Sequence, residues 1–162
     1  MELSDQIAQY LVSGLSTGVI YALIGIGFAI IYNATEIINF AQGELVMLGG
    51  MFTLFFQNAL KLPLPLAVLL AVAATTAAGA LFERLTIRPL KSPTPLGLII
   101  ITIGGSILIR GVAMLVWGKD THALPAFSGS EPLSIGAATI LPQHLWIFGL
   151  TAVAIVANKL FF

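Results

Sequence analysis

Apolar residues fill five long stretches of the chain, and polar residues separate these stretches at short breaks and in one longer loop. An α-helix needs ~20 residues to cross the ~30 Å of hydrocarbon in a bilayer, and every stretch reaches that length. The pattern therefore predicts an all-α, polytopic integral membrane protein with about five membrane segments. The predicted segments are Ile7–Tyr32, Ile37–Gln57, Leu64–Ile87, Leu96–Trp117 and Pro142–Phe162.

Composition supports this class of protein and argues against several kinds of binding site and bond. Of the 162 residues, 58% are hydrophobic and 9% are charged, whereas soluble domains carry about 25% charged residues. The formal net charge of zero argues against a basic face that binds nucleic acid. The chain has no cysteine, which excludes disulfides. Its first apolar stretch is too long for a cleavable signal peptide and lacks a basic start, so it is predicted to remain as a membrane helix.

The second stretch is the least suited to contact with lipid. Asn39, Gln42 and Glu44 fall within six residues, and an ionisable side chain at membrane depth costs ~3 kcal/mol or more, so it normally faces a bundle interior or a wet cavity. We expect this stretch either to cross the membrane fully, to be broken at Gly43 or Gly49, or to re-enter. The candidate pathway or gating residues, drawn from this stretch and the fourth, are Asn39, Phe40, Gln42, Gly43, Glu44, Thr102 and Gly105.

Glu44 has two interpretations. It either lines or gates a polar path, or it is a structural carboxylate that caps a broken helix, since anions are favoured at helix N-termini. Counting the helical rise from the inner ends of the two segments places Arg110 ~10 Å farther out than Glu44. We therefore expect Arg110 to snorkel outward or to bind carbonyls instead of pairing with Glu44. Asn39 and Gln42 are expected to form helix-to-helix hydrogen bonds, and Phe40 is expected to pack.

Small residues recur at helical spacing in three of the stretches, which is typical of tight helix–helix contact in membranes. They recur at steps of four and three in the first stretch and at steps of seven in the fourth, so each set falls on one helix face. Alanines at 67, 71, 74 and 78 form a similar face in the third stretch. The residues predicted to pack against other helices in the first and fourth stretches are Gly14, Gly18, Ala22, Gly25, Ala29, Gly97, Gly104 and Gly111.

Basic residues set the predicted orientation, because cytoplasmic loops carry an excess of Lys and Arg. Arg84, Arg88 and Lys91 surround a Pro-rich break that ends the third helix, so the loop through Pro95 is placed in the cytoplasm. The 118–141 loop is placed outside and has room for a short hairpin. The three basic residues either determine topology alone or, in a sharper hypothesis, also form a docking surface for a cytoplasmic partner. The side of the N-terminus depends on whether the second stretch crosses fully.

No constellation for catalysis, cofactor binding or a metal site appears in the sequence. His122 and His144 are the only histidines, and their places in a polar loop and at a membrane interface argue against a shared metal site. Residues 118–120 lack the Ser/Thr and the upstream Gly of a Walker A motif, and residues 25–27 lack the third Gly of a dinucleotide fingerprint. The chain is therefore expected to be no enzyme, and any ATP hydrolysis belongs to another chain.

One run of residues carries a resemblance to a known family. It reads Ile38-Asn39-Phe40-Ala41-Gln42-Gly43-Glu44, followed by Met47-Leu48-Gly49, and it resembles the LivH-type permeases of branched-chain amino-acid ABC importers. Members usually have His where this chain has Gln42, so a polar group stays but a titratable one is absent. Further matches, in the same order along the chain, are Gly18, Tyr21-Ala22-Leu23, Gly25, Gly27, Glu83-Arg84, Arg88-Pro89-Leu90 and Ile101-Thr102-Ile103-Gly104.

The resemblance implies a permease subunit of an ATP-binding-cassette importer that translocates branched-chain or other aliphatic amino acids. The implied partners are membrane lipid, an extracytoplasmic substrate-binding protein, cytoplasmic ATPase subunits, and a second permease subunit that is LivM-like or a copy of this chain. The implied location is multi-pass in a bacterial-type cytoplasmic (inner) membrane. No cofactor and no nucleic-acid partner is implied.

Members of this family are longer and dock the ATPase through a later cytoplasmic segment. Residues 1–162 are therefore expected to form a single transmembrane permease domain that is incomplete at its C-terminal end. Two alternatives stay open from the residues alone. One keeps the superfamily and changes the cargo to urea, a short amide or a sugar, and the other is a truncated membrane subunit that transports nothing.

Overall fold

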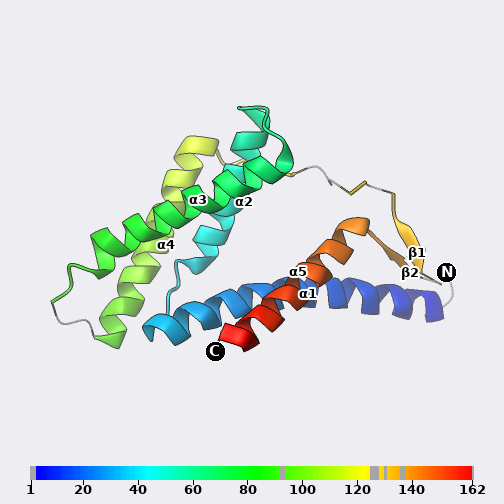
Figure 1. Ribbon diagram of the computed structural model, residues 1–162, viewed down its shortest axis with the longest axis horizontal. Coiled ribbons are helices and arrows are strands. Elements are labelled where there is room, and N and C mark those ends of the chain that lie inside the picture. The colour runs from blue at the N-terminus through cyan, green and yellow to red at the C-terminus, as the bar shows by residue number, and fades with distance from the viewer. Residues whose placement is uncertain (1–2, 92–93, 125–127, 130, 136–137, 162) are drawn as a thin grey trace. The chain divides into compact units, whose positions relative to one another are not determined.

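The computed structural model describes residues 3–91, 94–124, 128–129, 131–135 and 138–161 (Figure 1). The chain forms two compact units, one from Met1–Ala34 with Pro125–Phe162 and the other from Thr35–Leu124. The elements in chain order are α1 (Leu3–Thr35), α2 (Gln42–Asn58), α3 (Leu64–Phe82), the π-helical η1 (Glu83–Ile87), α4 (Pro95–Trp117), β1 (Leu133–Ile135), β2 (Ala138–Ile140) and α5 (Pro142–Phe161).

The all-α, polytopic fold class is confirmed. Within the described residues, three helical spans are long and apolar enough to cross a membrane: Asp5–Thr35, Leu64–Ile87 and Pro95–Trp117. They correspond to the first, third and fourth predicted segments. α2 and α5 occupy the second and fifth, and their crossing of the membrane stays a prediction. α2 has 17 residues, which extend ~25 Å at 1.5 Å per residue.

The second predicted segment begins later than its apolar pattern indicates. Residues 36–39 are not helical, and the Asn39 side-chain oxygen accepts a hydrogen bond from the Ala41 amide at 3.0 Å. From Gln42 the helix continues through all of its glycines, so the prediction of a break at Gly43 or Gly49 is wrong. A glycine inside a helix costs only ~1 kcal/mol relative to alanine, whereas unwinding at membrane depth would leave backbone groups unpaired.

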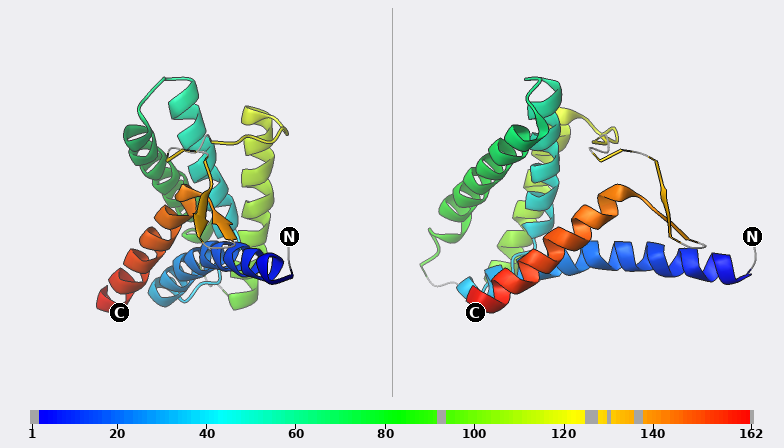
Figure 2. Two further views of the ribbon diagram at one scale, coloured as in Figure 1. Left: turned by 90° about the vertical axis from the view of Figure 1, so that its right-hand side faces the viewer. Right: turned by 45° about the vertical axis from the view of Figure 1, so that its right-hand side comes forward.

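α2 lies between α3 and α4 in the second unit (Figures 1 and 2). Its contact with α3 uses small residues, and Ala67 and Ala71 of the alanine face are buried. A Cβ atom built on Gly49 would lie 3.7 Å from the Thr75 hydroxyl, and one built on Gly79 would lie 3.6 Å from Leu45. Because apolar surface gains little in lipid, this close packing is what holds the two helices together.

α4 packs through a glycine that the seven-residue spacing did not select. Its buried residues are Thr102, Gly105 and Ala113, and a Cβ atom on Gly105 would overlap the Phe82 ring. Gly104 and Gly111 are exposed, and a Cβ atom on either would meet nothing within 4 Å among the described residues. A seam at those two glycines would need a partner outside the described residues of this unit, and it stays a prediction.

The first unit leaves the small-residue stripe of α1 uncovered. Gly14, Gly18 and Gly25 are not buried, and a Cβ atom on any of them would have no neighbouring atom within 4 Å in the described part of the chain. The predicted packing of this stripe is not seen within the first unit and therefore stays a prediction.

The 118–141 loop, in which the sequence left room for a short hairpin, contains one. β1 and β2 pair antiparallel, with Leu133 opposite Ile140 and Ser134 opposite Thr139. Gln9 of α1 fixes the second strand: its Oε1 accepts from the Thr139 amide at 2.8 Å, and its Nε2 donates to the Thr139 carbonyl at 3.2 Å. The hairpin is thus tied to α1 by hydrogen bonds to the backbone of Thr139 and by a third bond, 3.2 Å long, from the Thr139 hydroxyl to Gln9 Oε1.

We predict that Glu36→Gly is more stable than Glu36→Ala by about 1 kcal/mol, because glycine adopts the left-handed backbone without a Cβ clash. Glu36 has a φ of 56° in the connection between α1 and α2. The same pair of substitutions at Glu83, where φ is −57°, should show the opposite order. Thermal unfolding of the purified protein measures the stability of both pairs of variants. Equal stability of the two Glu36 variants would contradict a left-handed backbone at this residue.

Candidate functional site

Three polar residues of α4 face the segment that leads into α2. Thr102, Ser106 and Arg110 are spaced four residues apart on an otherwise apolar helix, so they share one face. We call these three residues and Glu44 the polar strip. The Thr102 hydroxyl lies 3.4 Å from the Ile38 carbonyl oxygen, the Ser106 hydroxyl donates to Glu44 Oε1 at 3.1 Å, and Arg110 Nη2 donates to the same Oε1 as an ion pair.

The Glu44–Arg110 ion pair corrects the prediction that Arg110 snorkels outward. Ile38 and Glu44 meet Thr102, Ser106 and Arg110 in the same order along the chain, so the segment that leads into α2 runs parallel to α4. Residues 36–39 are not helical and rise by up to ~3.3 Å each, against 1.5 Å in a helix. Glu44 therefore lies farther from the inner end than a helical count gives. The Arg110 side chain tilts towards the start of its helix, which covers the remaining distance.

Glu44 is buried, with 6% of its surface exposed. It lies in the first turn of α2, where a negative charge is stabilised by the helix dipole. Its carboxylate therefore occupies a helix N-terminus and is shielded by α4, whose Ser106 and Arg110 it contacts. The choice between a pathway role and a structural role stays open. The Ser106 and Arg110 donors add the compensation that a carboxylate needs away from water.

The other pathway residues predicted from the sequence differ in their burial and in their contacts. Thr102 and Gln42 are buried, whereas Phe40 and Gly43 are exposed. Asn39 uses its side-chain oxygen in the turn that precedes α2. Gly105 contacts the Phe82 ring, which makes it a packing residue in this unit.

Ser106 and Arg110 were missing from the predicted site, although the sequence contained a signal for them. They recur with Thr102 at steps of four on a helix that is otherwise apolar, and such a polar face requires a polar counterpart. The predicted cytoplasmic residues Arg84, Arg88 and Lys91 are exposed at and after η1. That exposure fits both topology and docking roles, and the choice between them stays open.

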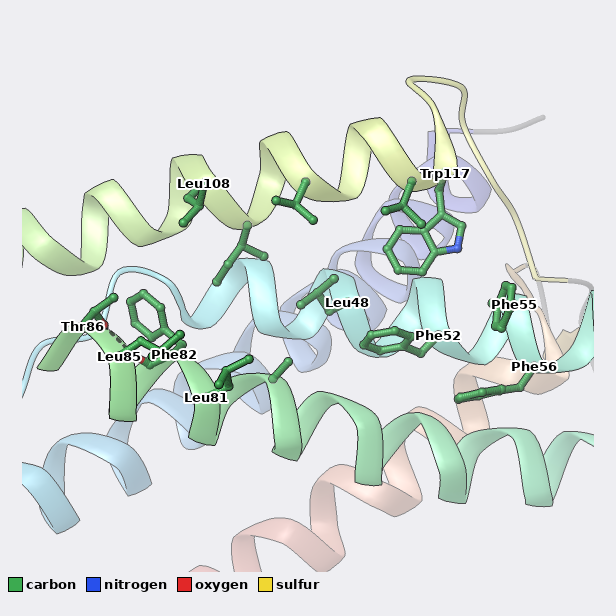
Figure 3. Close-up of a pocket in the computed structure, with 14 residues that line it drawn as sticks. Leu48, Phe52, Phe55, Phe56, Leu81, Phe82, Leu85, Thr86, Leu108 and Trp117 are labelled. Carbon is green, nitrogen blue, oxygen red and sulfur yellow. Dashed lines mark hydrogen bonds between the residues drawn. The ribbon is translucent and has the colours of Figure 1, made fainter. Parts of the chain in front are cut away.

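An apolar groove of about 600 Å³ lies between α2, α3 with η1, and α4. Figure 3 shows Phe52 and Trp117 towards one end of the groove and Phe82 and Leu85 towards the other. The Phe52 and Trp117 rings meet edge to face with centroids 5.5 Å apart. The lining residues are Leu48, Phe52, Phe55, Phe56, Ala78, Leu81, Phe82, Leu85, Thr86, Leu108, Ile109, Val112, Val116 and Trp117.

At 3.6 residues per turn, the groove residues Leu108 and Val112 fall on one side of the buried Thr102, and the strip residues Ser106 and Arg110 fall on the other. α4 thus presents apolar residues to the groove and polar residues to Glu44. Within the described ranges, no three His, Cys, Asp or Glu side chains group as metal ligands.

Comparisons with known proteins place the chain among transport proteins. The family described as "Branched-chain amino acid transport system / permease component" matches residues 10–161. The high-affinity branched-chain amino acid transport system permease protein BraD of Pseudomonas aeruginosa is 37% identical over 125 residues, which cover 72% of this chain and 41% of BraD. The corresponding protein LivH of Escherichia coli is 30% identical over 168 aligned positions, which cover 94% of this chain and 54% of LivH.

LivH of Salmonella typhimurium matches to the same extent as its Escherichia coli counterpart. The chain spans about half the length of the curated relatives it matches, 41% for BraD and 54% for LivH. No solved structure matches the chain.

Proposed function

This chain belongs to the family of branched-chain amino acid transport permease components, and from that premise we propose that it forms part of the permease subunit of an ATP-binding-cassette importer. Its cargo is a branched-chain or other aliphatic amino acid. The named relatives are permease proteins of branched-chain amino acid transport systems, which supports this cargo above urea, short amides or sugars. The chain acts as a transport subunit and not as an enzyme.

The observation that carries the proposal is the polar strip inside an apolar bundle. A carboxylate and a guanidinium at membrane depth are expensive to insert, and such groups mark substrate or ion pathways. Glu44 and Arg110 belong to α2 and α4, so a path along this strip would run between helices that both lie in the second unit. Movement of one helix against the other would open or close it.

The partners follow from the chemistry that this chain lacks. Its 162 residues contain no Walker A motif, so ATP hydrolysis is assigned to separate cytoplasmic ATPase subunits. An extracytoplasmic binding protein delivers the cargo, and a second permease subunit, LivM-like or a copy of this chain, completes the path in a bacterial-type cytoplasmic membrane. The basic residues near η1 face the cytoplasm in this arrangement.

Uptake into vesicles tests the proposal. We expect the complete transporter that contains this chain to accumulate radiolabelled leucine, isoleucine and valine when ATP and the binding protein are supplied. Excess unlabelled valine should compete with leucine, whereas excess urea, acetamide or glucose should not. A transporter with a hydrolysis-deficient ATPase subunit is the matched control. Accumulation that only urea, the amide or the sugar competes would reassign the cargo, and equal accumulation with and without active ATPase would reject the importer.

A further inference from the structure

Arg110 is the residue whose surroundings the packing of the helices leaves unexplained. Its side chain is 64% exposed, although the side chain of its partner Glu44, taken without the backbone, is only 8% exposed. It lies seven residues before the end of α4 at Trp117, which is ~10 Å along the helix axis. A guanidinium at that depth does not face hydrocarbon, because its N–H groups would have no acceptor there. The side of α4 that carries Arg110 therefore meets water, protein or a polar ligand.

The ion pair leaves hydrogen-bonding capacity unused on both partners. A guanidinium has five N–H donors, and Arg110 directs one nitrogen, Nη2, at Glu44. Glu44 accepts from both Ser106 and Arg110 through Oε1, and within the described part of the chain its Oε2 receives no hydrogen bond. The negatively charged Glu44 thus keeps one acceptor oxygen, and the positively charged Arg110 beside it keeps several N–H donors.

We propose that Glu44 and Arg110 together anchor the head group of a free α-amino acid. This inference rests on the proposed function and names the site that the cargo occupies. The cargo α-carboxylate binds the unused N–H groups of Arg110, whose planar fork matches a carboxylate with two parallel bonds. The cargo α-ammonium donates to Glu44 Oε2. Ser106 holds the carboxylate of Glu44 in position through Oε1.

A zwitterion suits this pair better than a singly charged ligand does. A lone anion at Arg110 would lie beside the Glu44 carboxylate and be repelled by it, and a lone cation at Glu44 would be repelled by Arg110. A molecule with both charges on neighbouring atoms neutralises each member of the pair. Leucine, isoleucine and valine share this head group and differ only in apolar side chains, so one anchor serves all three.

A cysteine placed beside the anchor reports its occupancy. Ile107 lies three residues before Arg110 and is 69% exposed, and the chain contains no cysteine of its own. In the complete transporter, with other subunits free of reactive thiols and without binding protein, we expect a water-soluble maleimide to label the Ile107→Cys variant. Saturating leucine should slow labelling at least several-fold. Leucinol, which lacks the carboxylate, and 4-methylpentanoate, which lacks the ammonium, should not.

Second-site substitutions assign the protection to the anchor. Arg110→Lys keeps the charge but loses the fork, so half-maximal protection should need about tenfold more leucine. Ser106→Ala leaves both charges in place and should raise that concentration several-fold. It replaces Arg110→Lys as the test variant if Arg110→Lys does not fold. Lys119→Gln, outside the helix and the strip, is the matched control and should leave the concentration unchanged.

Three results would overturn the anchor. They are absence of labelling by the hydrophilic reagent, labelling that leucine never slows, and equal protection by leucine, leucinol and 4-methylpentanoate. Burial of this face against a second permease subunit would produce the first. If the unsubstituted transporter accumulates leucine under ATP while any of these results holds, the anchor is rejected and the proposed function stands. If that transporter accumulates no aliphatic amino acid, the proposed function fails and the anchor fails with it.

Discussion

Arg110→Gln is expected to lower the yield and thermal stability of the folded protein several-fold more than Glu44→Gln does. Removing Arg110 leaves a buried carboxylate with a hydroxyl as its remaining partner, and an uncompensated buried charge is strongly destabilising. Removing the charge of Glu44 leaves a guanidinium that is 64% exposed and can turn to water or to a head group. The order of the two effects therefore follows from the unequal burial of the pair.

The double variant Glu44→Gln/Arg110→Gln should recover most of the loss caused by Arg110→Gln alone, because two neutral amides can hydrogen-bond to each other. The four proteins form a double-mutant cycle, and thermal unfolding of each in detergent gives the coupling between the two positions. Lys119→Gln controls for the loss of a positive charge elsewhere. Losses that simply add in the double variant would show that the two side chains do not interact.

Gly105→Leu should destabilise the second unit by about 1–3 kcal/mol or more, the usual cost of forcing extra carbon into a packed contact. A single Cβ atom at this position already overlaps the Phe82 ring, and Phe82 is buried with 9% of its surface exposed. The residue before it supplies the matched control. Gly104→Leu meets no atom within 4 Å of its Cβ atom among the described residues, so it should cost the folded chain little.

A compensating substitution identifies the cause of the Gly105 effect. Phe82→Ala in the Gly105→Leu background should restore part of the stability, because it removes the ring that the leucine displaces. Protease resistance and the unfolding midpoint of the purified protein measure this recovery. Equal losses for Gly104→Leu and Gly105→Leu would indicate that both glycines face a partner, and would contradict the packing of α4 seen in this unit.

The two predictions concern two neighbouring contacts of α4: Gly105 meets Phe82 at the end of α3, and Arg110 meets Glu44 of α2. Gly105 directly precedes Ser106, which donates to Glu44. A larger residue at 105 would therefore be expected to loosen the polar strip as well as the packing. The strip depends on the position of α4, which is why a packing residue of that helix belongs in an account of the pathway.

The amino-acid sequence by itself determined the fold class, the helices and most of their limits. Length and hydropathy select membrane helices because the bilayer sets the number of apolar residues that a span needs. The third segment, Leu64–Ile87, has the bounds that its pattern predicts, since proline and polar residues mark both ends. The polar 118–141 loop left room for the hairpin of β1 and β2, and the structure places it there. The sequence also contained the carboxylate at 44 and the reason why it must be shielded.

Only the tertiary structure decided which residues meet. The Glu44–Arg110 pair depends on the rise of the non-helical residues before α2, and helical periodicity gives no value for that rise. Gly104 and Gly105 are adjacent and chemically identical, so spacing could not tell which one packs. Gly105 is the glycine that packs, because it lies against the Phe82 ring. Register and close contact depend on residues distant in the chain, and for this reason the polar strip emerged from the fold and not from a motif.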